Sequence, residues 1–470
     1  MKIEKHLAAA RSLGDWLNDP GISLKTVEDL VDPAAFEATA ILEQLEMTGP
    51  PPPVLFPRVR SLDGSEGEFR LLFNAYASLQ SVAAALGSPA RSWPALLQDY
   101  VKRVRDVREP VRIDAAPVHE CSVSGSGVDL RILPWAGHVA GEGGEYFTPI
   151  AIGRSPTGVR RYNLSWNRAM YLDRNHIGMH ISPRDLWSFH REAEGAAKAL
   201  PVALVLGHHP AFNLGAAAAA NSATDEYPIA GALLGEAVRV APSLAYGDEL
   251  LIPADAEVII EGRLLPGVRV VEGPFGEYMR YLGPQKLSHV VEVDAITWRK
   301  GATIVEIFTC HLDHLNAHIS IEASLLEKAQ AAVSQVTGVS WFRGGGPTTL
   351  IIAMKKINEG QPMRAAMAAM SATNLVKQVI VVDNDIDIEN SQHVLWAVST
   401  RMRADTGITR LQNLQGIPLD PSGAGGFDST AGFIMDATWP LNRPHPPNGR
   451  VADAVLERFP LSRYRIRDRR

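Results

Sequence analysis

The spacing of hydrophobic and polar residues changes twice along the chain, which predicts three structural regions in series. In the first region, segments with apolar residues three or four positions apart alternate with short apolar runs. Gly87 follows the second periodic segment, where a glycine commonly ends a helix. We therefore predict an N-terminal α/β domain over residues 1–115. Its predicted elements are helices over residues 24–46, 71–86 and 94–107 and a strand over Val54–Phe56.

Residues 116–305 show a different pattern, with many apolar runs of strand length and few helical segments. Short strands separated by turn residues are typical of a β-barrel or a β-sandwich, so we predict a β-rich central domain. The alanine-rich stretch 216–220 is an exception and predicts a closely packed helix. The predicted strands cover residues 128–133, 146–152, 202–206, 256–260 and 287–293.

A helical pattern over residues 320–336 predicts a linker helix within residues 306–340. Strands and helices then alternate again, which is typical of a small parallel sheet with crossover helices. We therefore predict a C-terminal α/β domain over residues 341–470. Its predicted strands are 348–353 and 379–382, and its predicted helices are 363–372 and 394–401.

The composition is that of a globular protein, and we predict a cytoplasmic one. With 470 residues, of which 46% are hydrophobic and 21% charged, the chain is long enough for two or three domains. The formal net charge of −6 argues against a nucleic-acid partner. The two cysteines, Cys121 and Cys310, stand too far apart for a Cys-x-x-Cys metal site. The N-terminus lacks the apolar segment of a secretory signal, and no apolar run has the length of a membrane span.

The segment Glu272-Gly-Pro-Phe-Gly-Glu277 is the most informative stretch for chemistry. Its glycines permit backbone angles closed to other residues and its proline fixes one φ, so a rigid turn could aim both carboxylates into one site. Repulsion between the two acids would push their pKa values apart, leaving one protonated and the other ionised. The alternative is a tight hairpin with two solvent-exposed acids.

Two further segments offer polar groups for a site. Arg168, in Asn163-Leu-Ser-Trp-Asn-Arg168, carries a planar guanidinium suited to a carboxylate or a phosphate, although a surface ion pair is the alternative. The side-chain oxygen of Asn163 could bind a hard metal ion. Glu226 follows Asp225 at the start of a predicted helix, where an acid commonly caps the helix. With Asn163 and one more ligand, Glu226 would instead form an oxygen-rich site for Mg²⁺ or Mn²⁺.

The remaining polar clusters carry weaker signals. None of the histidines between residues 176 and 209 has the paired spacing of zinc ligands. We expect the polar segment 310–318 to contact substrate or cap a helix. Asp383, Asp385 and Asp387 alternate without the glycine and glutamate of a calcium loop, so a solvated strand end or a subunit contact is expected. The glycines of residues 344–347 precede a strand, which makes a poor phosphate loop.

Taken in order along the chain, these segments resemble the UbiD family of decarboxylases. The resemblance covers residues 70–440, and the Glu272–Glu277 segment is its most specific element. The expected fold class is α/β multidomain, with an N-terminal α/β unit, a central split β-barrel of the flavin-reductase type, a linker helix and a C-terminal α/β domain. The resemblance implies reversible, non-oxidative decarboxylation of an aromatic, heteroaromatic or α,β-unsaturated acid. It also implies prenylated FMN as cofactor, with its phosphate held through a divalent metal (Mn or Mg) and potassium.

Carried over residue by residue, the resemblance implies that Arg168, Glu272 and Glu277 form a catalytic network, with Glu277 as the proton donor. The chemistry of the side chains agrees, because Arg168 can orient a carboxylate bidentately and hold Glu272 ionised. In a dry pocket beside another acid, Glu277 is expected to have a raised pKa and to keep a proton near neutral pH. Phe275 is expected to exclude competing water.

The resemblance also implies that Asn163 and Glu226 are metal ligands. Many members have a histidine as the third ligand, and Asp185 takes that position here, with His180 and His190 as alternatives. The residues expected to contact the cofactor are Asn163, Leu164, Ser165, Trp166, Asn167, Arg168, Arg184, Asp185 and Glu226.

The sequence leaves the substrate acid open, and residues 311–318 with Trp341-Phe342-Arg343 are expected to shape its pocket. The expected partners are a flavin prenyltransferase that supplies the cofactor and further copies of the chain, because family members associate through the C-terminal domain. Two alternatives stay open. One is a flavin reductase or oxidase, which would show nicotinamide-dependent turnover. The other is a non-catalytic carboxylase-type subunit, in which Glu277→Gln would change nothing.

Overall fold

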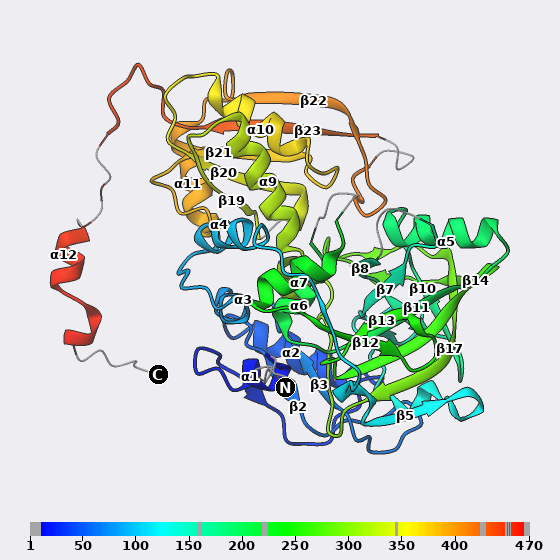
Figure 1. Ribbon diagram of the computed structural model, residues 1–470. Helices are drawn as coiled ribbons and strands as arrows, with labels where there is room; N and C mark the ends of the chain where they lie inside the picture. Colours follow the sequence, from blue (N-terminus) through cyan, green and yellow to red (C-terminus); the bar gives the residue numbers. More distant parts are fainter. Residues whose placement is uncertain are drawn as a thin grey trace, which may run out of the picture.

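The described part of the chain forms five β-sheets surrounded by helices (Figure 1). The computed structural model describes residues 11–157, 162–218, 224–343, 346–423, 429–446, 449, 451 and 453–464. The α-helices are α1 (Leu13–Leu17), α2 (Glu37–Glu46), α3 (Leu79–Leu86), α4 (Trp93–Arg103), α5 (Asp185–Gly195), α6 (Pro210–Ala216), α7 (Glu226–Leu234), α8 (Leu312–Ala317), α9 (Ile319–Ala332), α10 (Gln361–Met370), α11 (Ser391–Arg401) and α12 (Asp453–Arg458). Short 3-10 turns cover Pro117–His119, Gly125–Gly127, Leu130–Ile132, Gly346–Thr348 and Leu461–Arg463.

The N-terminal sheet has four strands and takes its last strand from far along the chain. Its order is β1 (Lys25–Thr26), β2 (Val54–Phe56), β3 (Arg70–Phe73) and β18 (Thr303–Val305). The helix predicted over residues 71–86 is therefore wrong in its first part, and the helix predicted over 24–46 begins only at Glu37. The apolar residues of β3 are buried on both faces, and such a run cannot be told from a buried helix by periodicity.

The central sheet has nine strands and curls into a half barrel (Figure 1), so the predicted fold class is confirmed. Its two longest strands, β14 and β17, are antiparallel neighbours in the middle of the sheet. The order is β6 (Tyr146–Phe147), β9 (Ala169–Tyr171), β10 (His176–Met179), β17 (Lys286–Trp298), β14 (Val258–Glu272), β11 (Leu200–Leu206), β7 (Ile150–Arg154) and β8 (Tyr162–Trp166), with β5 (Cys121–Ser124) paired to β17.

The strand predicted over residues 128–133 is wrong, because this segment forms a 3-10 turn over Leu130–Ile132. The side chain of Asp129 accepts a hydrogen bond from the backbone N–H of Arg131 at 3.1 Å, which stabilises a turn at the expense of an extended strand. Of the helix predicted over 216–220, only Ala216 is helical, as the last residue of α6; residues 217 and 218 follow the helix end, and residues 219–220 lie outside the described residues.

Two small sheets accompany the barrel, and a larger one forms the C-terminal region. In the latter, β20, β21 and β23 are parallel and the edge strands are antiparallel, with α10 and α11 as the expected connecting helices. Asp383 and Asp385 at the end of β21 pair with Arg401, each at 2.7 Å. The sheets are β13 (Gly247–Pro253), β12 (Arg239–Ser243) and β4 (Val111–Arg112); β15 (Phe275–Gly276) and β16 (Leu282–Gly283); and β19 (Val336–Trp341), β20 (Thr349–Met354), β21 (Gln378–Asp383), β23 (Ser429–Ala437) and β22 (Ile408–Gln415).

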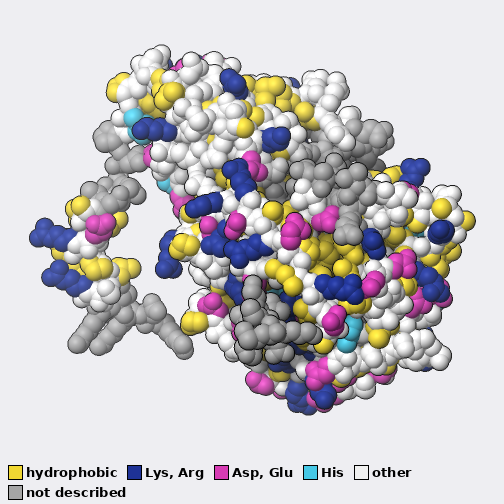
Figure 2. All heavy atoms as spheres, in the orientation of Figure 1, with side chains coloured by type: hydrophobic (Ala, Val, Ile, Leu, Met, Phe, Trp, Pro, Cys, Tyr) yellow, Lys and Arg dark blue, Asp and Glu magenta, His cyan; other side chains and the backbone are white. Residues whose placement is uncertain are grey.

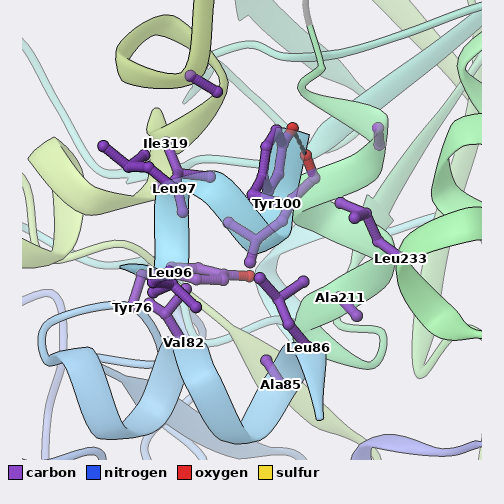
Figure 3. Close-up of a cluster of buried hydrophobic side chains, with 14 of the residues drawn as sticks. Tyr76, Val82, Ala85, Leu86, Leu96, Leu97, Tyr100, Ala211, Leu233 and Ile319 are labelled. Atoms are coloured by element: carbon purple, nitrogen blue, oxygen red, sulfur yellow. Dashed lines mark hydrogen bonds between the residues drawn. The ribbon is translucent and has the colours of Figure 1, made fainter. Parts of the chain in front are cut away.

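One continuous hydrophobic cluster joins the helices of the N-terminal region to the barrel and to the C-terminal sheet. Figure 3 shows a part of this cluster, in which Tyr76, Tyr100 and Leu233 come from different segments of the chain. Burying each such side chain contributes roughly 1.5–3 kcal/mol, so this cluster is a rigid support for whatever it carries. Tyr76 is one member of this cluster that also contacts the polar site described below, through the ring of Trp166.

The surface mixes both signs of charge, and Figure 2 shows Lys and Arg side chains interspersed with Asp and Glu side chains on the face in view. The helix α12 lies apart from the rest of the chain (Figure 1). Among the described residues, no helix combines the length and apolar character needed to cross a membrane.

Candidate active site

The Glu272–Glu277 segment is a loop anchored inside the protein, and it is not a solvent-exposed hairpin. It begins where β14 ends and continues through β15, which pairs with β16. The backbone N–H of Gly273 donates to the hydroxyl of Tyr146 at 3.1 Å, and that of Gly276 donates to Glu142 at 3.0 Å. These contacts fix the direction of the carboxylates at both ends.

Two glycines allow the loop to take this path. Gly273 has φ of +90°, a conformation that residues with a side chain rarely adopt. Gly143 lies against the loop and donates its N–H to the carbonyl oxygen of Pro274 at 2.9 Å. A Cβ at Gly143 would stand 2.2 Å from the carbonyl oxygen of Gly273, which no packing can accommodate. The close approach of these two segments therefore requires glycine at position 143.

Arg168 bridges the two glutamates of the loop. It follows β8 and precedes β9, and its guanidinium grips Glu272 with two parallel hydrogen bonds, Nε to Oε1 at 2.8 Å and Nη2 to Oε2 at 3.0 Å. The remaining nitrogen, Nη1, donates to Oε1 of Glu277 at 2.5 Å. The guanidinium also lies 5.0 Å from the centre of the Phe275 ring, within the range of a cation–π contact. Arg168 thus forms one cluster with Glu272 and Glu277, which lie 104 and 109 positions after it in the sequence.

The two acids of this cluster differ in their surroundings. Glu272 is fully buried and also accepts a hydrogen bond from the hydroxyl of Ser288 at 3.2 Å. The Glu277 side chain is 13% exposed, and its hydrogen bond to Arg168 is the one that the described residues provide. Burial raises the pKa of Glu277 to about 7, and the charge of Glu272 adds to this effect, while Arg168 and Lys286 oppose it. Glu277 therefore holds a proton that it can give up near neutral pH.

The arrangement corrects one expectation about Arg168. Nε and Nη2 of Arg168 already donate to Glu272, and Nη1 donates to Glu277. The guanidinium therefore has no pair of nitrogens free to bind a further carboxylate with two hydrogen bonds. Arg168 orients the two glutamates instead.

Asn163 and Glu226, the first two predicted metal ligands, lie side by side. Glu226 is the first residue of α7, and β8 is an edge strand whose open side faces it. The backbone N–H of Leu164 donates to Oε2 of Glu226 at 2.9 Å, and the side-chain nitrogen of Asn163 lies 3.5 Å from the same oxygen. Both side chains are buried. A carboxylate and an amide thus meet at the start of a helix, whose dipole favours an anion. The amide nitrogen of Asn163 faces Glu226, and its oxygen accepts a hydrogen bond from the hydroxyl of Ser165 at 3.2 Å.

The candidates for the third ligand occupy different places. Asp185 is half-buried in the first turn of α5, which packs against β8. His180 donates its backbone N–H to the carbonyl of Arg168 at 3.2 Å. His190 is fully buried on the same helix as Asp185, but its ring packs edge-on against His289 at 4.9 Å. Arg184, at the N-cap of α5, is exposed.

The predicted cofactor-contacting segment 163–167 divides into buried and accessible parts. The side chain of Leu164 belongs to the hydrophobic core, so only its backbone can contact a ligand. Ser165 and Asn167 hydrogen-bond to each other at 3.0 Å. Trp166 packs edge-on against Tyr76 at 5.8 Å, and its buried indole N–H has no hydrogen-bond acceptor among the described residues. A buried donor without a partner is uncommon and marks a place for a ligand atom.

A buried ionic network behind the loop was not predicted. His138 lies between Glu142, 3.6 Å from Nδ1, and Glu306, 3.1 Å from Nε2. Burial works to lower the pKa of His138, but the interactions with Glu142 and then Glu306 outweigh it and raise that pKa to about 10. Because Glu142 also accepts the N–H of Gly276, this network positions the loop. The only signal in the sequence is the four-residue spacing of His138 and Glu142, which is too common to find it.

The residues expected to shape a substrate pocket are brought only partly to the site. Tyr278, next to Glu277, packs against His314 at 5.0 Å and His318 at 5.5 Å. His311 points elsewhere, since it stacks on Phe308 at 3.7 Å. Arg343 contacts Asn316, so this residue of the C-terminal region also reaches the polar segment.

Comparison with known proteins places this geometry in a family. Three family models match: the 3-octaprenyl-4-hydroxybenzoate carboxy-lyase N-terminal domain over residues 22–104, its Rift-related domain over 109–312 and its C-terminal domain over 314–437. The chain belongs to the UbiD family of carboxy-lyases. The family expected from the sequence is thereby confirmed, whereas the exact domain boundaries stay a prediction.

Individual UbiD-family relatives cover most of the chain. The chain is 31% identical over 348 residues to the anhydromevalonate phosphate decarboxylase of Aeropyrum pernix, covering 73% of this chain and 77% of the relative. It is 29% identical to the phenolic acid decarboxylase of Sedimentibacter hydroxybenzoicus, covering 72% of each. Among solved structures, the UbiD-class enzyme HmfF of Pelotomaculum thermopropionicum, in complex with FMN, superposes with a TM-score of 0.88 at 33% identity, covering 97% of this chain and all of that one.

Proposed function

We propose that this UbiD-family protein removes carbon dioxide, reversibly and without oxidation, from an aromatic, heteroaromatic or α,β-unsaturated carboxylic acid. The observation that carries the proposal is the buried cluster in which Arg168 joins Glu272 and Glu277. It holds one acid that keeps its proton to about neutral pH next to one that is paired with the guanidinium. A decarboxylase needs such a donor, because the carbon that loses carbon dioxide must receive a proton.

We propose prenylated FMN as the cofactor, together with a divalent metal (Mn²⁺ or Mg²⁺) and potassium. Solved relatives were obtained with FMN and with prFMN. The residues present fit such a group, because a carboxylate and an amide, Glu226 and Asn163, lie side by side in a buried position and the buried indole N–H of Trp166 has no acceptor among the described residues. Asn163, Glu226 and Asp185 would hold the metal, as hard oxygen ligands do. When bound, the flavin would supply the electron sink for the pair released as the carbon–carboxylate bond breaks.

The protein's own groups then have three tasks. Glu277 donates its proton to the carbon that carried the carboxylate, and takes a new one from solvent through its exposed edge. Arg168 holds Glu277 in place through its single hydrogen bond. Phe275 and Tyr146, both buried, keep water away from the transfer.

The decisive experiment is co-expression with a flavin prenyltransferase, followed by the absorption spectrum and mass of the bound cofactor. Carbon dioxide release is then measured with hydroxybenzoic, furoic, pyrrole-carboxylic and cinnamic acids. We expect turnover of at least one acid, and its loss in Glu277→Gln with the cofactor retained. Glu292→Gln, on a partly exposed acid paired with Arg263, is the matched control and keeps activity.

Other results would favour the alternatives. Nicotinamide-dependent flavin turnover without carbon dioxide release would identify a reductase or oxidase. Unchanged function in Glu277→Gln would identify a non-catalytic subunit. We also propose that the protein is cytoplasmic and forms a homo-oligomer. Light scattering on the purified protein tests the oligomeric state; the relative HmfF has been solved in an evolved dimeric form.

A further inference from the structure

A second cation, Lys286, stands beside the Arg168 cluster and has no role in the function proposed so far. Lys286 is the first residue of β17, and it is the register partner of Glu272, the last residue of β14. Directly opposed residues of an antiparallel pair project from the same face of the sheet. The side chain of Lys286 therefore leaves the sheet on the side where Glu272 meets Arg168.

The neighbouring residues confirm which face this is. Ser288, two positions along the strand from Lys286, donates its hydroxyl to Glu272. Val271 and Leu287, the alternate residues of the same two strands, are 55% and 72% exposed on the opposite face. Lys286 thus shares the inner face with the cluster, although its own side chain is only half-buried.

Lys286 is not neutralised by the acids around it. Its charge acts on Arg168, Glu277 and Glu272, yet its ammonium group forms no ion pair within 4.0 Å among the described residues. Arg168 and Glu272 already balance each other. When Glu277 is protonated, the cluster and Lys286 together carry one uncompensated positive charge, at the moment when an anionic substrate has to enter.

We propose that Lys286 binds the carboxylate of the substrate as it enters the site, a role that the occupied guanidinium of Arg168 leaves open. This inference rests on the proposed function, since it presumes a carboxylic acid substrate. An ion pair made in the enzyme–substrate complex and lost with carbon dioxide strengthens binding without lowering the chemical barrier. Lys286 therefore sets KM and the preference for an acid over a neutral analogue, while Glu277 sets kcat.

The test measures binding on a background that does not turn over. Benzoate, furan-2-carboxylate and cinnamate, and the three corresponding carboxamides, are titrated calorimetrically into Glu277→Gln protein purified from the co-expression. We expect at least one carboxylate to bind more tightly than its amide. Lys286→Met should weaken carboxylate binding roughly 10- to 100-fold and leave amide binding unchanged, as expected for one charge-assisted hydrogen bond. Lys286→Arg should restore most of the preference.

Controls separate a charge effect from a folding effect. Lys300→Met removes a lysine that is 76% exposed, two residues beyond the far end of β17, and should leave both affinities unchanged. Raising the salt concentration should weaken carboxylate binding in the parent protein more than in Lys286→Met. In the active enzyme, Lys286→Met should raise KM. It should also shift the decrease of kcat to higher pH, because Lys286 lowers the pKa of Glu277.

Two results would overturn the inference. One is equal affinity for carboxylate and carboxamide in the parent protein; the other is an unchanged preference in a folded Lys286→Met variant. Neither result depends on turnover. Absence of a bound flavin or of carbon dioxide release would instead contradict the proposed function, so the two failures are distinguishable.

Discussion

The pH dependence of turnover is the sharpest consequence of the Arg168 cluster. Burial raises the pKa of Glu277 from the ordinary 4.5 to about 7, which corresponds to roughly 3 kcal/mol in favour of the protonated acid. A pKa of about 7 leaves Glu277 about nine-tenths protonated at pH 6 and about one-tenth protonated at pH 8. Because the donor must be protonated, kcat should fall as the pH rises through 7, approaching a tenfold loss per pH unit above it.

The assay follows carbon dioxide release at saturating acid between pH 5 and 9, with cofactor occupancy read from the flavin absorbance at each pH. Glu277→Asp keeps an ionisable donor one methylene further away, so its kcat should be lower and should still fall as the pH rises. Glu277→Gln should have no measurable kcat at any pH because its side chain has no acidic proton to give. A kcat that stays flat from pH 6 to 8.5 at constant occupancy, or one that rises over this range, would refute the assignment.

Three further perturbations test the rest of the site. Glu226→Ala should lose metal and flavin together, as measured by elemental analysis and absorbance, and a fully loaded variant would count against its role as a ligand. Gly143→Ala forces a Cβ to within 2.2 Å of the loop backbone and should reduce kcat at least tenfold, while Gly144→Ala meets only a flexible methionine side chain and should stay active. His138→Gln leaves two buried carboxylates without their cation and should lower the free energy of unfolding by about 3–5 kcal/mol. The same change at His176, in a surface pair, should lower it by less than about 1 kcal/mol in urea titrations; equal losses would contradict the network.

The elements of the fold were predictable to different degrees. The apolar runs at 256–260 and 287–293 were correctly assigned to strands, but β14 and β17 extend well beyond them. The missed part of β14 carries exposed residues such as Val268 and Val271, so the hydrophobic signal fades there. The missed part of β17 is mainly its buried end, where Asp294 interrupts the apolar run. The missed end of β14 is the part that places Glu272 opposite Lys286.

The site shows the same division. Glu272 and Glu277 could be related from the sequence because only five positions separate them, and the resemblance to a family added Arg168. No periodicity rule connects His138 with Glu306, which is 168 positions away, so the network that supports the loop could not be predicted from the sequence. Long-range polar contacts depend on how sheets pack, and a single sequence carries that information only indirectly.

The two glutamates that one guanidinium holds differ in the hydrogen bonds they accept, and this difference separates their roles. Glu272 accepts two hydrogen bonds from Arg168 and one from Ser288, and each of these donors stabilises a charged carboxylate. Glu277 accepts one, so its burial is poorly compensated and protonation relieves it. Because both residues are glutamates, their different roles follow from the number of donors that the fold places around each position.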